Sequence, residues 1–319
     1  YESYWDEFVD SWRQAKGLGP DTHAEGSVPK DWDIVDYYGV DVGVASADET
    51  LWPSRIEELE PIGNYTRQRD GWGRVVRERE GAQFSIIEST GKAEADRDVD
   101  ALDFEPADQS SRYTAFEAKV AVERERRCVF AKVGGPFLRL SYLRGMEQWL
   151  MELAAEPDFA RALVARMADH QIAIGLESLR RGTLWNTGIW IFDDMCSHIN
   201  PMFSPRTFED VFMPSYSRMI DAFKSAGARH VCLHCDGNLA PLLPLLIDAG
   251  IDAIQPVQYS SGMVINTLKK QYGEQLAYIG GVDNVQTLPS GTDAEARRHF
   301  AELVEWAHEG GVILGSHSI

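Results

Sequence analysis

Alternation between short apolar runs and helical patterns constrains the fold of this chain more than any other feature. The apolar runs are bounded by glycine, proline or polar residues and cover residues 128–133, 187–192, 230–233, 252–257, 276–279 and 311–314. Such βα repeats build a parallel sheet, and their even spacing favours an α/β fold of the (β/α)8 TIM-barrel type over an open doubly wound sheet. No Gly-x-Gly-x-x-Gly opens a helix after a strand, which argues against dinucleotide binding.

The remaining parts of the chain are predicted to decorate this barrel. Residues 1–319 are expected to form one domain, since α/β barrels commonly exceed the usual domain size. Apolar residues at helical spacing predict an N-terminal helix and loop over residues 1–30. Short strand-like runs separated by glycines predict a small antiparallel excursion over residues 62–90.

Charge and composition exclude several classes of partner. The net charge of −19 would repel nucleic acid and anionic membrane surfaces. No apolar stretch is long enough to span a membrane. The four cysteines are too few and too scattered for a disulfide framework, which predicts a reducing, cytoplasmic location. The absence of an initiator methionine and of a helix after the last apolar run suggests that residues are missing at both ends.

The sequence His234-Cys235-Asp236 directly follows the strand predicted at residues 230–233. It therefore lies at the carboxyl end of a parallel strand, where α/β proteins place their chemistry. Strand side chains alternate, so His234 and Asp236 point one way and Cys235 the other. A histidine and a carboxylate on one face can hold a divalent metal. Cys232 shares that face one layer deeper and is a reserve ligand.

Further candidates follow other predicted strands. Asp193 and Asp194 follow the run at residues 187–192, and because neighbours alternate, only one of these two candidate catalytic carboxylates can enter the site. Asp283 follows two glycines that would let the backbone approach a ligand. His198 and Tyr259 lie in loops after two strands, and with Asp283 they are the candidate substrate-binding residues.

Several segments match one protein family in order and spacing. The block at residues 230–258 resembles the corresponding segment of the uroporphyrinogen decarboxylase superfamily, and most closely that of its corrinoid-linked methyltransferases. Further matches are Phe192-Asp193-Asp194 with Ser204-Pro205 behind it, Arg144-Gly145-Met146-Glu147, Gly280-Gly281-Val282-Asp283 and Gly315-Ser316-His317-Ser318-Ile319. Together these matches cover residues 130–319.

The resemblance implies a set of metal ligands. The methyltransferase branch carries a His-x-Cys zinc pair at this turn and a late Cys as the third ligand. The matching positions here are His234, Asp236 and His317, which become the candidate metal ligands. Asp and His donate less charge than two thiolates, so a zinc ion held by them is a stronger Lewis acid. Such an ion suits an ether or alcohol oxygen better than thiol activation, and iron or manganese is an alternative metal.

The resemblance further implies a zinc-dependent methyltransferase of the O-demethylase type. It would move a methyl group between a small donor, such as an O-methyl aromatic, and cobalamin carried by a partner corrinoid protein. Two alternatives stay open: a uroporphyrinogen decarboxylase-like lyase, and a non-catalytic ligand-binding barrel. The decarboxylases grip substrate carboxylates with an Arg-Gln-Ala-Gly-Arg motif. The segment Arg13-Gln14-Ala15-Lys16-Gly17 lacks the second arginine and lies in a helical pattern, so we interpret it as a coincidence.

Overall fold

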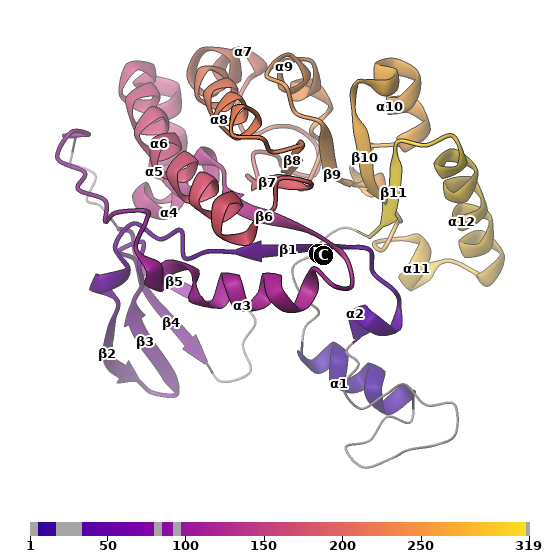
Figure 1. Cartoon of the computed structure of the whole chain (residues 1–319), viewed down its shortest axis with the longest axis horizontal. Coiled ribbons are helices and arrows are strands. Elements are labelled where there is room, and N and C mark those ends of the chain that lie inside the picture. The colour runs from indigo at the N-terminus through magenta and orange to yellow at the C-terminus, as the bar shows by residue number, and fades with distance from the viewer. Residues whose placement is uncertain (1–5, 17–33, 80–84, 92–96, 317–319) are drawn as a thin grey trace.

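A parallel sheet of seven strands forms the frame of the molecule in the computed structural model, which describes residues 6–16, 34–79, 85–91 and 97–316 (Figure 1). The strands follow one another across the sheet in chain order. They are β1 (Val42–Ser46), β6 (Cys128–Gly134), β7 (Gly188–Phe192), β8 (His230–His234), β9 (Ala253–Val257), β10 (Ala277–Gly281) and β11 (Val312–Gly315). The predicted α/β class and the parallel pairing of the repeats are thereby confirmed.

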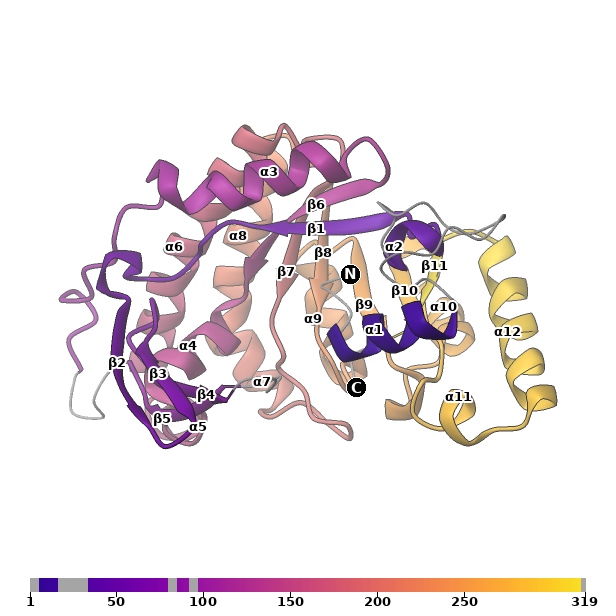
Figure 2. The same cartoon turned by 90° about the horizontal axis from the view of Figure 1, so that it is seen from below.

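The sheet curls like part of a barrel but does not close among the described residues (Figure 2). β1 and β11 are its two edges, and each pairs with a neighbour on one side only. The described residues thus show the α/β, TIM-like part of the predicted (β/α)8 barrel as an open sheet of seven strands. The alternation in the sequence reports that βα units repeat, whereas closure also depends on strand tilt and stagger, which the alternation does not encode.

Helices cover the outer face of the curled sheet. They are α3 (Thr114–Glu123), α4 (Pro136–Arg144), α5 (Met146–Ala155), α6 (Pro157–Gly182), α8 (Met213–Ser225), α9 (Leu243–Asp248), α10 (Ile265–Tyr272) and α12 (Asp293–His308). Several begin with proline in the first turn, where the missing N–H is not needed. α12 begins with a capping box between Thr292 and Glu295.

Alternation along the central strands divides the apolar side chains between two cores. Ile189, Ile191, Val231 and Leu233 belong to the large core between the sheet and the helices. Val44, Trp190, Phe192, Cys232 and Ala253 form a separate cluster on the concave face. Cys232 thus faces inward while Cys235 joins the outer core, as the sequence pattern predicts.

A second, antiparallel sheet is inserted between β1 and α3. Its strands are β2 (Glu57–Ile62), β3 (Tyr65–Arg69), β4 (Val75–Arg79) and β5 (Ile86–Ser89). The predicted excursion is present, but it begins earlier, at β2. This strand was not predicted because it is largely exposed and has no alternation of apolar residues. Trp72, in the turn between β3 and β4, packs edge-on against Tyr142 of α4, with the two ring centroids 5.7 Å apart.

The N-terminal segment contributes α1 (Asp6–Ala15) and α2 (Ile34–Tyr37). Trp12 of α1 is buried against Ile34 and Val35, which gives this segment a small core of its own. Residues 17–30 of the predicted loop lie outside the described residues. In the described part of the chain, no helix combines the length and apolarity that a membrane crossing requires.

Candidate metal centre

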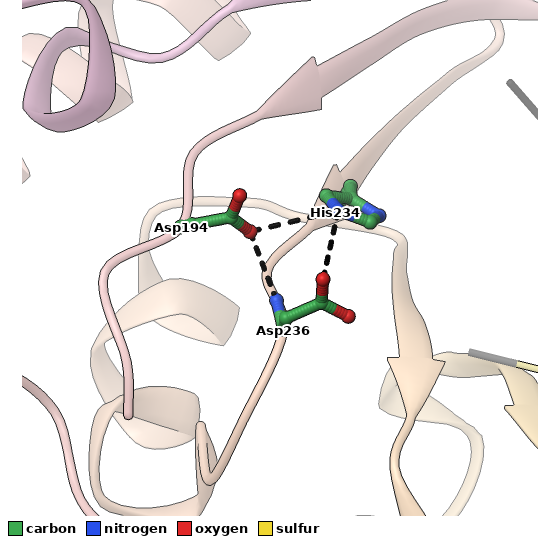
Figure 3. Close-up of side chains that lie close together, drawn as sticks. All are labelled: Asp194, His234 and Asp236. Carbon is green, nitrogen blue, oxygen red and sulfur yellow. Dashed lines mark hydrogen bonds and ion pairs between the residues drawn. The ribbon is translucent and has the colours of Figure 1, made fainter. Parts of the chain in front are cut away.

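Three potential metal ligands meet where β7 and β8 end (Figure 3). The Nε2 atom of His234 lies 3.5 Å from Oδ1 of Asp194 and 3.8 Å from Oδ2 of Asp236. One ligand atom from each residue lies within 4.8 Å of the other two. The backbone N–H of Asp236 also donates to Asp194 Oδ1 at 3.0 Å. Two of the three residues therefore hold each other in place as well as facing the imidazole.

The parallel register explains why these residues converge. Phe192 of β7 pairs with His234 of β8, so Asp194 and Asp236 each lie two residues beyond a paired position. Side chains two residues apart share one face of a strand, and both carboxylates therefore continue the concave face. The sequence predicted the contribution of His234 and Asp236, and the register adds Asp194 as the third member.

Burial differs between the histidine and the two carboxylates. The side chain of His234 is 7% exposed, whereas those of Asp194 and Asp236 are 37% and 33% exposed. The imidazole stacks on Phe192 with a centroid distance of 4.4 Å and an interplanar angle of 16°. Its Nδ1 donates to Oε1 of Gln255 at 2.5 Å. The ring is thus anchored within the protein, while both carboxylate side chains are partly exposed.

The donor set fits a divalent metal. One imidazole nitrogen and two carboxylate oxygens are common ligands of Zn²⁺ and also suit Fe²⁺ and Mn²⁺. Three protein ligands leave coordination positions open for a substrate oxygen, as in catalytic sites. Predicted ligand His317 lies outside the described residues, so the structure does not place it.

Asp193 points the opposite way from Asp194, as the alternation predicts. Its carboxylate is fully buried and accepts hydrogen bonds from the N–H groups of Phe137 and Leu138 at 3.1 and 2.6 Å. The hydroxyl of Tyr216 donates to it at 2.7 Å. Burial raises the pKa of Asp193 to about 7 despite these donors. Asp193 therefore supports the first turn of α4, and Asp194 is the member of the predicted catalytic pair that enters the site.

Asp283 also lies in a structural turn. Its carboxylate accepts the N–H groups of Val285, Gln286 and Thr287 and the hydroxyl of Thr287. Burial acts to raise the pKa of Asp283, but these donors outweigh it and lower the pKa. The side chain holds the loop after β10 through these hydrogen bonds, and its predicted substrate-binding role stays a prediction.

His198 and Tyr259 lie on loops that border the triad of Asp194, His234 and Asp236. The two loops are joined by a hydrogen bond of 2.9 Å between Nδ1 of His198 and the hydroxyl of Ser261. Both contact the turn that carries Asp236: the carbonyl of Ser197 accepts from the N–H of Asn238, and Gln258 Oε1 accepts from the N–H of Gly237. Tyr259 is 37% exposed. Their predicted role in binding a substrate stays a prediction.

Gln255 and Gln258 were not predicted from the sequence as part of the site, and both contact the His234–Gly237 segment. A signal was present, because Gln255 is a polar residue at an inward position of an otherwise apolar strand. Cys235 was expected to pack, and it does: the buried thiol accepts the N–H of Met195 at 3.3 Å, and burial raises its pKa. Burial also raises the pKa of Cys232 to about 12, which does not favour thiolate ligation there.

Comparisons with known proteins place this site in a family. The family model described as uroporphyrinogen decarboxylase (URO-D) matches residues 81–317, well over half of the chain. No curated protein gives a significant match. A solved methyltransferase from Methanosarcina mazei superposes with a TM-score of 0.61 and 17% sequence identity, covering 78% of this chain and 70% of the solved chain. At this identity the likeness concerns the fold, whereas the family model carries the assignment. The chain belongs to the uroporphyrinogen decarboxylase family.

Proposed function

We propose that this protein is a metal-dependent methyltransferase of the corrinoid-linked branch of its family. It would move a methyl group between a small donor and cobalamin carried by a separate corrinoid protein. The observation that carries the proposal is the triad of Asp194, His234 and Asp236 at the carboxyl end of the parallel strands. The fold likeness to a solved methyltransferase supports the reaction class.

In this proposal Asp194, His234 and Asp236 hold the metal, with zinc as the first candidate and His317 as a further ligand. A zinc ion bound there supplies Lewis acidity toward a substrate oxygen. Carboxylates donate less charge than thiolates, so this donor set favours an oxygen-bound methyl group over a thioether. The chain's own part is to keep the imidazole fixed by Phe192 and Gln255 while Asp194 and Asp236 remain accessible at the opening.

Apolar side chains beside the site suit an aromatic donor such as a methoxyarene. Ile199 and Met202, in the loop after β7, are 70% and 39% exposed, and Tyr259, in the loop after β9, is 37% exposed. The side chain of Asn238, next to the turn of Asp236, donates to the carbonyl of Ile199 at 2.8 Å. Apolar groups presented next to carboxylates would bind an arene while its ether oxygen faces the triad, and would leave an apolar rim for the corrinoid partner.

We further propose a complete barrel around the site and a cytoplasmic location. A further strand between the open edges of β1 and β11 would complete the (β/α)8 barrel. The four cysteines are unpaired, which favours a reducing compartment such as the cytoplasm.

The proposal is tested by combining metal analysis with a methyl-transfer assay. We expect about one divalent ion per chain, and a spectral change from cob(I)alamin to methylcobalamin when a methoxyarene is added. His234→Ala should remove both the ion and the spectral change. His230→Ala is the matched control, because His230 lies exposed at the opposite end of the same strand. Bound metal without alkylation by any methyl donor would instead favour a non-catalytic binding barrel.

Uroporphyrinogen decarboxylation is the second candidate, because the matching family model is named after that activity. Arg13 lies in the last turn of the N-terminal helix α1, so the first three residues of the incomplete arginine motif are helical. We expect no conversion of uroporphyrinogen to coproporphyrinogen under anaerobic conditions. Detectable conversion would reverse the order of the two candidates.

A further inference from the structure

Gln255 lies directly beside His234 on the neighbouring strand. The pairing of β8 with β9 sets the two residues opposite each other, and the carbonyl of Gln255 also accepts the N–H of Cys235 at 2.8 Å. The neighbours Ala253, Ile254 and Val257 are buried and apolar. A polar side chain in such a strand costs free energy unless it is hydrogen-bonded. The amide of Gln255 meets that requirement through its 2.5 Å contact with the imidazole.

This contact determines which imidazole nitrogen carries the proton. An amide oxygen can only accept a hydrogen bond, so Oε1 facing Nδ1 requires the proton to be on Nδ1. The lone pair is then on Nε2, the atom that faces Asp194 and Asp236. The reversed amide would donate its NH₂ group to Nδ1 and place the proton on Nε2. The imidazole would then donate to a carboxylate and could not bind a cation.

Two neighbours of the ring have separate tasks. Phe192 stacks on the imidazole and fixes the plane of the ring. Stacking does not distinguish the two nitrogens, because an imidazole flipped by about 180° stacks on Phe192 equally well. The hydrogen bond to Gln255 does distinguish them, since it is made at Nδ1 alone.

We propose that Gln255 is a positioning residue that sets the tautomer of His234 and thereby keeps its Nε2 lone pair available to a divalent metal. The second half of this inference rests on the proposed metal centre, whereas the first half concerns the metal-free protein. A glutamine at this place serves as the outer hydrogen-bond partner that metal-binding histidines commonly require.

The test compares two substitutions of Gln255 with a matched control. Gln255→Glu keeps the shape of the side chain, and its ionised carboxylate can accept hydrogen bonds but cannot donate them. Gln255→Leu fills similar space and makes no hydrogen bond. Gln258→Leu is the control, because Gln258 holds the N–H of Gly237 at 2.7 Å in the same turn without a hydrogen bond to the imidazole. Nitrogen-15 NMR of the metal-free proteins reports the tautomer of His234, identified by the signals lost in His234→Ala. Competition with a chelator then measures Zn²⁺ affinity.

We expect the proton on Nδ1 in the wild type, in Gln255→Glu and in Gln258→Leu, and on Nε2 in Gln255→Leu. The Zn²⁺ affinity of Gln255→Leu should fall about 10- to 100-fold, while Gln255→Glu retains wild-type affinity or exceeds it. A wild-type protein with the proton on Nε2, or a Gln255→Leu protein with an unchanged tautomer, would overturn the inference. Equal Zn²⁺ affinity in all variants would also overturn it and leave the metal centre intact. The expected tautomers without metal binding would uphold the role of Gln255 in setting the tautomer and reject the metal centre.

Discussion

Two polar clusters lie on opposite faces of the same strand ends, and their carboxylates differ in exposure and in the groups that surround them. On the concave face, an imidazole nitrogen and two partly exposed carboxylates face one another. Behind the sheet, Asp193 receives two backbone N–H groups and the Tyr216 hydroxyl. The fully buried carboxylate of Asp193 stabilises the fold through its three donors. The two carboxylates that converge with the imidazole are partly exposed and form a place where a cation can bind.

The cluster behind the sheet extends to Glu49, Arg139 and His170. The carboxylate of Glu49 accepts from the guanidinium of Arg139 and the N–H of Gly134. Nε2 of His170 donates to the backbone carbonyl of Glu49 at 3.0 Å. This cluster combines carboxylates with a histidine, as the concave triad does, and adds an arginine. Residue type alone therefore does not distinguish a site from a structural network, whereas the exposure of the carboxylates does.

The largest expected effect separates the two adjacent aspartates. Asp194→Asn should lower Zn²⁺ affinity by about 100-fold or more with little change in thermal stability, because it removes a charged ligand from a partly exposed position. Asp193→Asn should leave metal binding nearly unchanged and lower the free energy of unfolding by about 1–3 kcal/mol, because it disturbs buried hydrogen bonds. Calorimetric metal titration and denaturant unfolding measure the two effects. Equal loss of metal binding in both variants would erase the distinction between the clusters.

The next effect concerns the ion pair behind the sheet. Arg139→Met should lower the free energy of unfolding by about 3–5 kcal/mol, because Glu49 would then be left without its cationic partner in a largely buried position. The double variant Arg139→Met, Glu49→Leu should recover part of that loss, since no unpaired charge remains. Urea unfolding of the three proteins gives the comparison. A double variant no more stable than Arg139→Met would show that packing, and not charge pairing, holds this region.

The smallest net effect is the pH dependence of stability that the cluster behind the sheet contributes. Burial lowers the pKa of His170 to about 4, so its contribution to the free energy of unfolding is lost as pH falls from about 6.5 toward 4. Burial raises the pKa of Asp193 to about 7, so its contribution is lost as pH rises from about 3.8 through 7. The two trends oppose each other between pH 4 and 6.5, and each amounts to roughly 3–4 kcal/mol.

Single substitutions of His170 or Asp193 should therefore reveal the pH dependence of stability that the other residue contributes. His170→Gln should make the protein progressively less stable as pH rises from 4 to 7, and Asp193→Asn should make it more stable as pH rises from 4 to 6.5. Unfolding free energies across this range, measured beside the wild type, reveal both slopes. Parallel curves for the three proteins would mean that neither group changes its protonation on folding.

Much of the fold could be predicted because the parallel sheet repeats one local pattern. Each strand is a short apolar run, and each following helix shows its own period, so the βα units are visible in sequence. The open edges at β1 and β11 could not be predicted, because closure depends on geometry that no local pattern records. β2 was missed for a related reason: Glu57, Glu58 and Glu60 are exposed and give the strand no apolar face.

The site was predictable to the extent that it depends on alternation within one strand. His234 and Asp236 share a face because they lie two residues apart, and Asp193 and Asp194 diverge because they are neighbours. The meeting of Asp194 with His234 depends on the register between β7 and β8, which a single sequence does not state. Gln255 likewise contacts His234 across a strand boundary, so this contact emerged only with the structure.

The hydrogen bond from the backbone of Asp236 to the side chain of Asp194 makes the two carboxylates unequal for redesign. Any residue at position 236 other than proline retains the backbone N–H, so the ligand type there can be exchanged, for instance to a thiolate, while Asp194 stays anchored. A change at position 194 that removes the carboxylate removes a proposed ligand and also the acceptor that holds the turn of Asp236. An engineer seeking a softer metal should therefore begin at position 236 and leave position 194 untouched.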